Sequence, residues 1–226
     1  MRMFNVMAVF CILLMAGAAF GATINEIRID QPSTDNDEYF ELAGTPGESL
    51  DGLWFLSVGD GTGGSGVIET AVDLTGYVIQ PDGVFAMGET SFSNTCGSID
   101  ATGTLNFENS DNLTFLLVTD FTGSAGDDID VAEDGVIDNV LWTAIIDDVA
   151  FVENTDVPTF GEYYYSANVV GPDGTYVPGH AAFCGGMWQI LDFDLCTITE
   201  TIGEPSDEFC DPVANDAATF GSLRAQ

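Results

Sequence analysis

Short apolar stretches separated by tight turns run through the first two thirds of this chain. They are rich in β-branched and aromatic residues, which strands favour. The sequence predicts strands at residues 24–30, 38–42, 53–58, 66–74, 83–87, 113–118 and 145–152. Turns with Gly, Pro or Asp separate these stretches, as at residues 44–47 and 81–83. Because no segment shows a sustained 3.6-residue period with helix caps, we predict an all-β fold, a β-sandwich.

The composition changes after Val152. Residues 162–170 are rich in aromatic side chains, residues 185–193 include Trp188, and the remainder is loop-like and contains cysteines. The pattern is compatible with a small second domain or with an extension that packs its aromatic residues on the sandwich. We predict the second arrangement, with residues 22–152 forming the sandwich and residues 153–226 forming a loop-rich, disulfide-pinned C-terminal extension.

The first 21 residues have the features of a signal peptide. Arg2 supplies a positive start, residues 6–16 form an apolar run, and Ala19 and Gly21 are small residues at the positions that a signal peptidase reads. An uncleaved anchor is the alternative, but the apolar run is short for a bilayer. No later stretch is long and apolar enough for a transmembrane helix. We therefore predict a secreted, extracellular or periplasmic, or cell-surface location, with no membrane segment after cleavage.

Four cysteines remain after removal of residues 1–21. They are Cys96, Cys184, Cys196 and Cys210. An even number of cysteines in an exported chain predicts two disulfides, and four cysteines allow three pairings among which the sequence does not choose. Zinc binding is the alternative, but the C-x-x-C spacing typical of structural zinc sites is missing.

The charge balance is extremely acidic. The chain has 37 Asp plus Glu residues against three Lys plus Arg, no lysine, one histidine and a formal net charge of −34. Such a surface repels phosphate backbones, which excludes nucleic-acid binding through basic contacts. It also repels itself and destabilises the compact state unless counterions are present. Two interpretations follow, solubility in a salty medium and specific binding of divalent cations.

The densest run of acids lies at residues 127–138, and calcium coordination is the chemistry that it suggests. Calcium takes several oxygen ligands from alternating positions, with a glycine at a sharp bend, and Gly135 could provide that bend. The predicted ligands are Asp128, Asp130, Glu133, Asp134 and Asp138. The run departs from the EF-hand pattern, because Ala132 stands where an oxygen is expected and no Glu closes the loop. A solvated acidic loop is therefore the alternative to a Ca²⁺ site.

Four segments of the N-terminal third form a recognisable series. INEI at residues 24–27 is followed by EYFEL at 38–42, LDGLWFL at 50–56 and PDGVFAM at 81–87. This series resembles the lamin-tail domain, whose strands and turns have the same order. The resemblance covers about residues 24–89 and continues loosely to Val152. The whole chain is similar to uncharacterised secreted bacterial proteins that contain such a domain.

The resemblance implies an immunoglobulin-like β-sandwich that serves as a binding or structural module and contributes no catalytic residues. Fold alone does not fix function, so this implication is an analogy. The leading prediction is a secreted, non-catalytic binding or surface module, stabilised by calcium. Its partner would be an extracellular or cell-surface protein or a polysaccharide.

A small secreted hydrolase is the alternative function. It would use a pair of carboxylates, which is all that glycoside hydrolysis requires, or His180, the single histidine. The Gly-x-Ser-x-Gly motif of many hydrolases is incomplete at residues 63–67, where its final glycine is replaced by Val67. With no lysine and one histidine, most nucleophilic schemes lack a required group, so we predict no catalytic residue.

The signal peptide and the cysteine count give a first testable prediction. We expect the mature chain to begin near Ala22 and to contain no free thiol. Intact-mass measurement of the exported protein, with and without alkylation under native, unreduced conditions, checks both statements. Alkylation of two or more cysteines would contradict the disulfides, and a mass that includes residues 1–21 would contradict cleavage.

Overall fold

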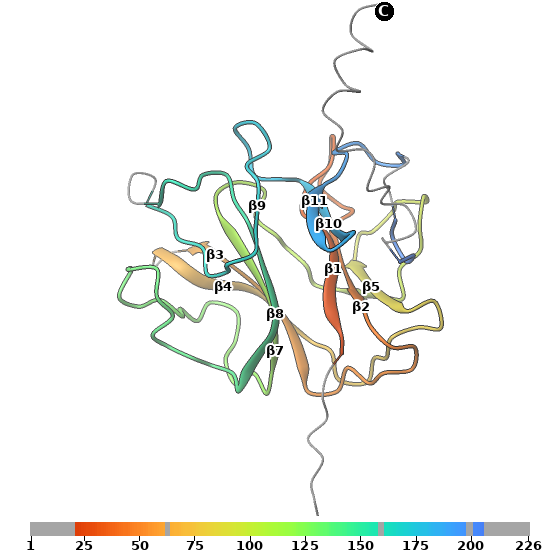
Figure 1. Ribbon diagram of the computed structural model, residues 1–226, viewed down its shortest axis with the longest axis horizontal. Coiled ribbons are helices and arrows are strands. Elements are labelled where there is room, and N and C mark those ends of the chain that lie inside the picture. The colour runs from red at the N-terminus through yellow and green to blue at the C-terminus, as the bar shows by residue number, and fades with distance from the viewer. Residues whose placement is uncertain (1–20, 62–63, 158–160, 198–200, 206–226) are drawn as a thin grey trace, which may run out of the picture.

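The computed structural model describes residues 21–61, 64–157, 161–197 and 201–205. Two β-sheets pack face to face in this part of the chain, so the predicted all-β sandwich is confirmed (Figure 1). Residues 1–20 of the predicted signal peptide and Cys210 lie outside the described residues. No helix in the described ranges is long and apolar enough to cross a bilayer.

One sheet has six strands in the order β11-β10-β1-β2-β5-β6. Its strands are β1 (Thr23–Arg28), β2 (Tyr39–Ala43), β5 (Val84–Glu89), β6 (Ala101–Gly103), β10 (His180–Cys184) and β11 (Met187–Ile190). The other sheet has five strands in the order β4-β3-β7-β8-β9. Its strands are β3 (Leu53–Gly61), β4 (Gly64–Asp73), β7 (Leu113–Thr119), β8 (Ala144–Phe151) and β9 (Val169–Val170). The β5–β6 and β8–β9 pairs are parallel, and the other neighbours are antiparallel.

Strand β7 is buried on both faces, which explains its continuous apolar sequence. Leu113, Phe115 and Leu117 point into the core between the sheets. Leu116 and Val118, which alternate with them, join a second cluster on the opposite face of the five-stranded sheet. A strand with both faces covered does not need polar residues at alternate positions.

Aromatic side chains join the two sheets across the main core. The rings of Phe40 in β2 and Phe55 in β3 stack with their centroids 3.9 Å apart and their planes 6° from parallel. Phe115 of β7 lies against Phe55 at 5.8 Å, and Phe151 of β8 meets Trp188 of β11 edge-on at 6.1 Å. Such aromatic pairs add to the burial of apolar area that holds the sheets together.

The seven strands that the sequence predicts correspond to β1, β2, β3, β4, β5, β7 and β8. The prediction missed β6, β9, β10 and β11. Three of these come from residues 153–226, and they join both sheets: β9 pairs with β8, while β10 pairs with β1. The residues assigned to the extension therefore complete the sandwich as well as covering it.

A disulfide links Cys96 to Cys196, whose Cα atoms lie 5.2 Å apart. The two cysteines are 100 residues apart in sequence, so the bond ties the segment after β5 to the segment after β11. Cys184, in β10, is also disulfide-bonded. The structure thus supplies a pairing that the sequence left open, and it confirms that a disulfide holds the C-terminal part of the chain.

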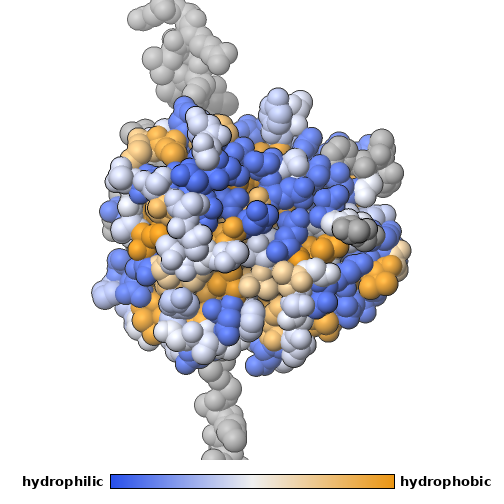
Figure 2. Space-filling view, turned by 180° about the vertical axis from the view of Figure 1, so that it is seen from behind, coloured by the Kyte–Doolittle hydropathy of each residue, from blue (hydrophilic) through white to orange (hydrophobic). Residues whose placement is uncertain are grey.

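The surface carries few continuous apolar areas on the face opposite that of Figure 1. Figure 2 shows this face with several separate hydrophobic patches set among hydrophilic residues. Scattered surface apolar residues of this kind are ordinary for soluble domains.

Candidate functional site

The acidic loop at residues 126–139 lies along the free edge of β4. Ile68 of β4 donates its backbone N–H to Asp127 O at 2.9 Å and accepts from Gly126 N at 2.7 Å, and Ile129 N donates to Gly66 O at 2.9 Å. Ile129 is fully buried in the second apolar cluster. The loop is therefore attached to the sheet by both hydrogen bonds and packing.

Backbone N–H groups hold the carboxylates of this loop. Asp130 is fully buried and accepts from Asp134 N at 3.2 Å, from Gly135 N at 2.7 Å and from the hydroxyl of Tyr165 at 3.0 Å. Each of the other four predicted metal ligands also accepts from a backbone amide: Asp128 from Asp130, Glu133 from Ser65, Asp134 from Val136, and Asp138 from Val131 and Ala132. Backbone amides therefore supply some of the favourable partners that these carboxylates would otherwise find in a calcium ion. A Ca²⁺ site in this loop stays a prediction.

Three other carboxylates lie close enough together that they could hold a metal ion. One oxygen from each of Asp60, Glu108 and Asp111 lies within 4.8 Å of the other two. Asp60 stands near the end of β3, and the other two belong to the connection that leads into β7. All three side chains are half-buried.

Hydrogen bonds fix the connection that contributes two of these carboxylates. Before Glu108, the backbone N–H of Phe107 donates to both oxygens of Glu38, at 3.1 and 3.0 Å. After Asp111, the side chain of Asn112 accepts from Glu153 N at 2.9 Å and donates to Glu162 O at 3.0 Å. The acids at positions 108 and 111 are therefore held between two anchored residues.

Two further carboxylates, Glu69 in β4 and Glu162, surround this group. One oxygen in each of Glu69, Glu108 and Glu162 is buried without a hydrogen-bond partner. Burial, and then the charges of neighbouring acids, raises the pKa of Glu69 to about 8 and the pKa of Glu108 and Glu162 to about 7. We call these five residues the carboxylate cluster: Asp60, Glu69, Glu108, Asp111 and Glu162. Its buried oxygens need either protons or a cation.

Sequence reasoning missed the carboxylate cluster because its members come from separate stretches of the chain. Strand pairing brings them together: β3 and β7 are antiparallel neighbours, with Val58 opposite Thr114. Asp60 lies two residues after Val58 and Asp111 three residues before Thr114, so both stand near the same end of the pair. Knowledge of this pairing would have found the cluster, but no local motif marks it.

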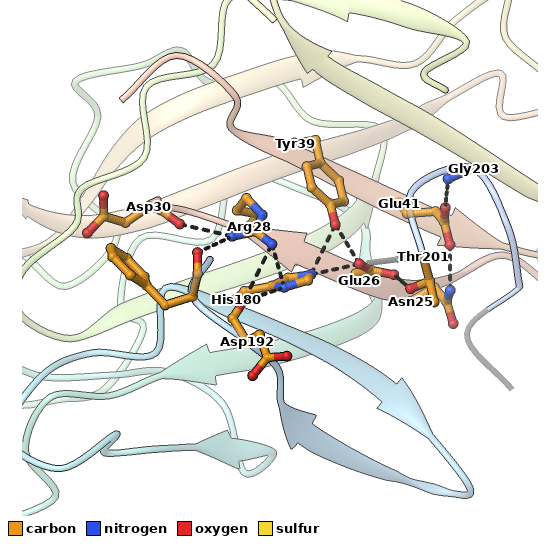
Figure 3. A network of polar contacts seen from close by, with 11 residues as sticks. Asn25, Glu26, Arg28, Asp30, Tyr39, Glu41, His180, Asp192, Thr201 and Gly203 are labelled. Atoms are coloured by element: carbon orange, nitrogen blue, oxygen red, sulfur yellow. Dashed lines mark hydrogen bonds and ion pairs between the residues drawn. The ribbon is translucent and has the colours of Figure 1, made fainter. Parts of the chain in front are cut away.

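His180, the histidine of the alternative hydrolase function, belongs to a buried polar network (Figure 3). Its Nε2 atom lies 2.7 Å from Glu26 Oε1, and its Nδ1 atom lies 2.8 Å from Arg28 Nη2. Tyr39 donates its hydroxyl to Glu26 at 2.5 Å, and the hydroxyl of Thr201 donates to the other oxygen of Glu26. The network joins β1, β2 and β10 to the C-terminal segment, residues 201–205. Ile202 of this segment packs against Tyr39 and Ala86 on the outer face of the six-stranded sheet.

Glu41, which accepts from Asn25 and from the backbone N–H of Gly203, also belongs to this network. The pKa values of Glu26 and Glu41 are shifted in opposite directions. Burial raises the pKa of Glu26, but hydrogen bonding and attraction from His180, with hydrogen bonds from Thr201 and Tyr39, outweigh burial and hold it below its ordinary value. Burial and the charge of Glu26 raise the pKa of Glu41 well above its ordinary value. His180 is 1% exposed, and its contacts link β10 to β1 and β2.

A second group of acids lies beside the connection between β6 and β7, the segment that contains Glu108 and Asp111. Burial, and then the charges of Asp30 and Glu89, raises the pKa of Asp35 to about 6. Glu38, 4% exposed, has a pKa raised to about 8 by burial, against the hydrogen bond from Phe107, and by Asp35 and other acids. Asn109 donates to Asp35 Oδ2 at 3.3 Å, so the connection between β6 and β7 contacts acids on both of its sides.

Comparison with known proteins identifies no relative. No protein-family model, no curated protein and no solved structure matches the chain. The resemblance to lamin-tail domains consequently stays a prediction from sequence motifs, and the function has to be argued from the chain's own residues.

The opposite pKa shifts of Glu26 and Glu41 predict opposite responses to the same substitution. Glu26→Gln removes a buried negative charge that faces His180, and we expect it to lower the free energy of unfolding by about 3 kcal/mol. Glu41→Gln replaces a carboxyl whose raised pKa favours the neutral form, and it is the comparison, with a smaller expected loss. Urea unfolding at neutral pH measures both. Equal losses for the two variants would contradict the assignment of charge.

The raised pKa of Glu38 predicts a stability that falls as pH rises. Between the ordinary pKa near 4.5 and the folded value of about 8, the folded state binds more protons than the unfolded state. The free energy of unfolding contributed by this group therefore decreases over that window. We expect Glu38→Gln to match the parent near pH 5 and to be more stable than it at pH 8.

The exposed carboxylate of Glu204 provides the control, since Glu204→Gln removes the same formal charge and reports general relief of repulsion. Thermal unfolding from pH 5 to pH 8 at constant ionic strength gives the comparison. A gain at pH 8 for Glu38→Gln that is no larger than the gain for Glu204→Gln would show that Glu38 has no special role.

Proposed function

We propose that this protein is a secreted, non-catalytic binding or surface module whose fold is stabilised by Ca²⁺ held by Asp60, Glu108 and Asp111. The observation that carries the proposal is the convergence of three carboxylate oxygens within 4.8 Å. The buried, unpaired oxygen of Glu108 adds to it. Export rests on the predicted signal peptide, and the module class on the resemblance to lamin-tail domains.

Electrostatic repulsion makes this cluster unfavourable when its carboxyls are charged and no cation is bound. Two full charges about 5 Å apart repel by roughly 3 kcal/mol at the effective dielectric constant of sites near a protein surface, before screening by salt. The chain has three Lys plus Arg residues in total, and Arg28 is placed in the buried network with His180. A bound divalent cation would attract each of these carboxylates, and this attraction would outweigh their mutual repulsion.

Calcium suits the cluster better than magnesium. Calcium accepts six to eight oxygen ligands in flexible geometry, whereas magnesium requires a near-ideal octahedron and dehydrates reluctantly. Glu69 and Glu162 lie beside the three convergent acids and offer further oxygens. The ion would connect β3 to the connection before β7, two segments that the chain otherwise joins through more than forty residues.

A hydrolase is the second candidate, because the same cluster contains neighbouring carboxyls with pKa values near neutrality. Glu69 or Glu108, whose pKa values are raised to about 8 and about 7, would hold the proton that the general acid of glycoside hydrolysis needs. Such an enzyme would lose hydrolysis of a soluble polysaccharide on Glu108→Gln and would not require calcium. The module function predicts no hydrolysis by the parent protein.

The calcium site is tested by thermal unfolding. We expect millimolar CaCl₂ to raise the melting temperature more than NaCl of matched ionic strength, because binding to the folded state adds about 2.7 kcal/mol at a hundredfold excess over Kd. Asp60→Asn combined with Asp111→Asn should raise the melting temperature without calcium, since repulsion is relieved, and should remove the calcium-specific rise. The direct measurement is calcium titration by calorimetry.

The acidic loop supplies the matched control. Asp134→Asn combined with Asp138→Asn removes the same formal charge, and the variant should keep the calcium-specific rise. If these loop variants lose the rise and the cluster variants keep it, calcium binds at residues 127–138 instead. If NaCl reproduces the whole effect, neither site binds calcium and the proposal fails.

A further inference from the structure

A cavity of about 440 Å³ opens beside the segment that follows β11, and one of its lining residues, Asn109, belongs to the same connection as Glu108 and Asp111. Its walls include Asp30, Asn109, Asp173, Tyr176 and Phe193. This volume is within the range of small-molecule sites, roughly 300–1,000 Å³. Nothing in the calcium proposal uses these side chains, so the cavity requires an account of its own.

Two aromatic side chains at the cavity are left in solvent. Tyr176 is 73% exposed and Phe193 is 43% exposed. Tyr176 is held in a tight turn, because Asp173 N donates to Tyr176 O at 2.8 Å and Tyr176 N donates to Asp173 O at 3.1 Å. The turn therefore presents an aromatic ring and a carboxylate together at the same cavity.

The backbone of Phe193 is also fixed. Its carbonyl oxygen accepts from Arg28 Nη1 at 2.9 Å, and the carbonyl of Asp30 lies 3.4 Å from the same nitrogen. Figure 3 shows the carboxylate of Asp30 directed away from Arg28, while its carbonyl oxygen faces the guanidinium. Arg28 thus fixes the backbones of two residues that line the cavity, Asp30 and Phe193, by hydrogen bonds to their carbonyl oxygens.

The polar groups of the cavity are acidic or neutral. Asp30 and Asp173 contribute carboxylates, Asn109 contributes an amide, and Asp35 is hydrogen-bonded to that amide at 3.3 Å. None of the residues that line the cavity is Lys, Arg or His. Although Arg28 attracts Asp30, the two carboxylates would repel an anionic ligand and attract a cationic one.

We propose that this cavity binds an organic ammonium group, with Asp30 and Asp173 neutralising the charge and Tyr176 and Phe193 packing against the cation. Ammonium ions are attracted both to carboxylates and to the faces of aromatic rings, and exposed aromatic side chains around a negative pocket recognise quaternary ammonium ligands. Alkylammonium compounds and amino sugars share this chemistry. The site shares no side chain with the proposed calcium site.

Matched pairs of probes test the proposal by calorimetry on the mature protein. Choline is compared with 3,3-dimethylbutan-1-ol, its uncharged isostere, and glucosamine with glucose. All titrations contain saturating CaCl₂ at constant ionic strength, so that loss of calcium binding cannot imitate loss of this site. We expect the charged member of at least one pair to bind about tenfold more tightly than its neutral partner. Which pair responds distinguishes an alkylammonium ligand from an amino sugar.

Substitutions locate the binding. Asp173→Asn and Tyr176→Ala should each weaken ammonium binding by about tenfold. Asp120→Asn is the matched control, since Asp120 is an exposed acid at the opposite end of β7, and it should bind as the parent does. Melting temperatures confirm that the variants fold. Equal affinity for charged and neutral probes, unchanged binding by both cavity variants, or no binding of either ammonium probe at millimolar concentration would overturn the proposal.

Discussion

Carboxylates in this protein are held mainly by backbone N–H groups, because the chain offers almost no cationic side chains. Asp37 accepts from the amides of Ser93 and Asn94, and Glu48 accepts from those of Gly21, Ala22 and Thr45. Hydrogen bonds from amides to carboxylates are charge-assisted and stronger than neutral ones. Acids thereby help to fix the conformation of the connecting segments that they accept from.

Some buried carboxylates are not fully satisfied by backbone amides. They are accommodated in three different ways, and each way has a different chemical consequence. Glu26 remains charged because His180 and two hydroxyls face it, which ties the C-terminal segment to β1. Glu41 and Glu38 have raised pKa values and favour the neutral form. The carboxylate cluster has several buried oxygens without partners, so an external cation is the natural complement. The position of each acid relative to amides and to other acids therefore decides its role.

The sequence predicted strands well where one or both faces are covered by apolar residues, as in β3 and β7, because alternation and β-branched content are local signals. It missed β10, where His180 follows Pro178 and Gly179 and two glycines come after Cys184, since such residues indicate loops. It also missed the carboxylate cluster, which exists only through the pairing of β3 with β7. The acidic loop was chosen for its density of acids, and the sequence does not show which amides those acids would accept from.

Attachment of the acidic loop to β4 has a consequence for how chains of this protein meet one another. An outer strand with free N–H and C=O groups is a template on which a second molecule can add its own strand, and this is a route to fibres. In β4 part of that edge is already taken by Gly126, Asp127 and Ile129. Repulsion between acidic molecules weakens in brine, where screening acts over a few ångströms. A covered edge does not weaken in that way, so this edge of β4 is guarded against stacking even where salt has removed electrostatic protection.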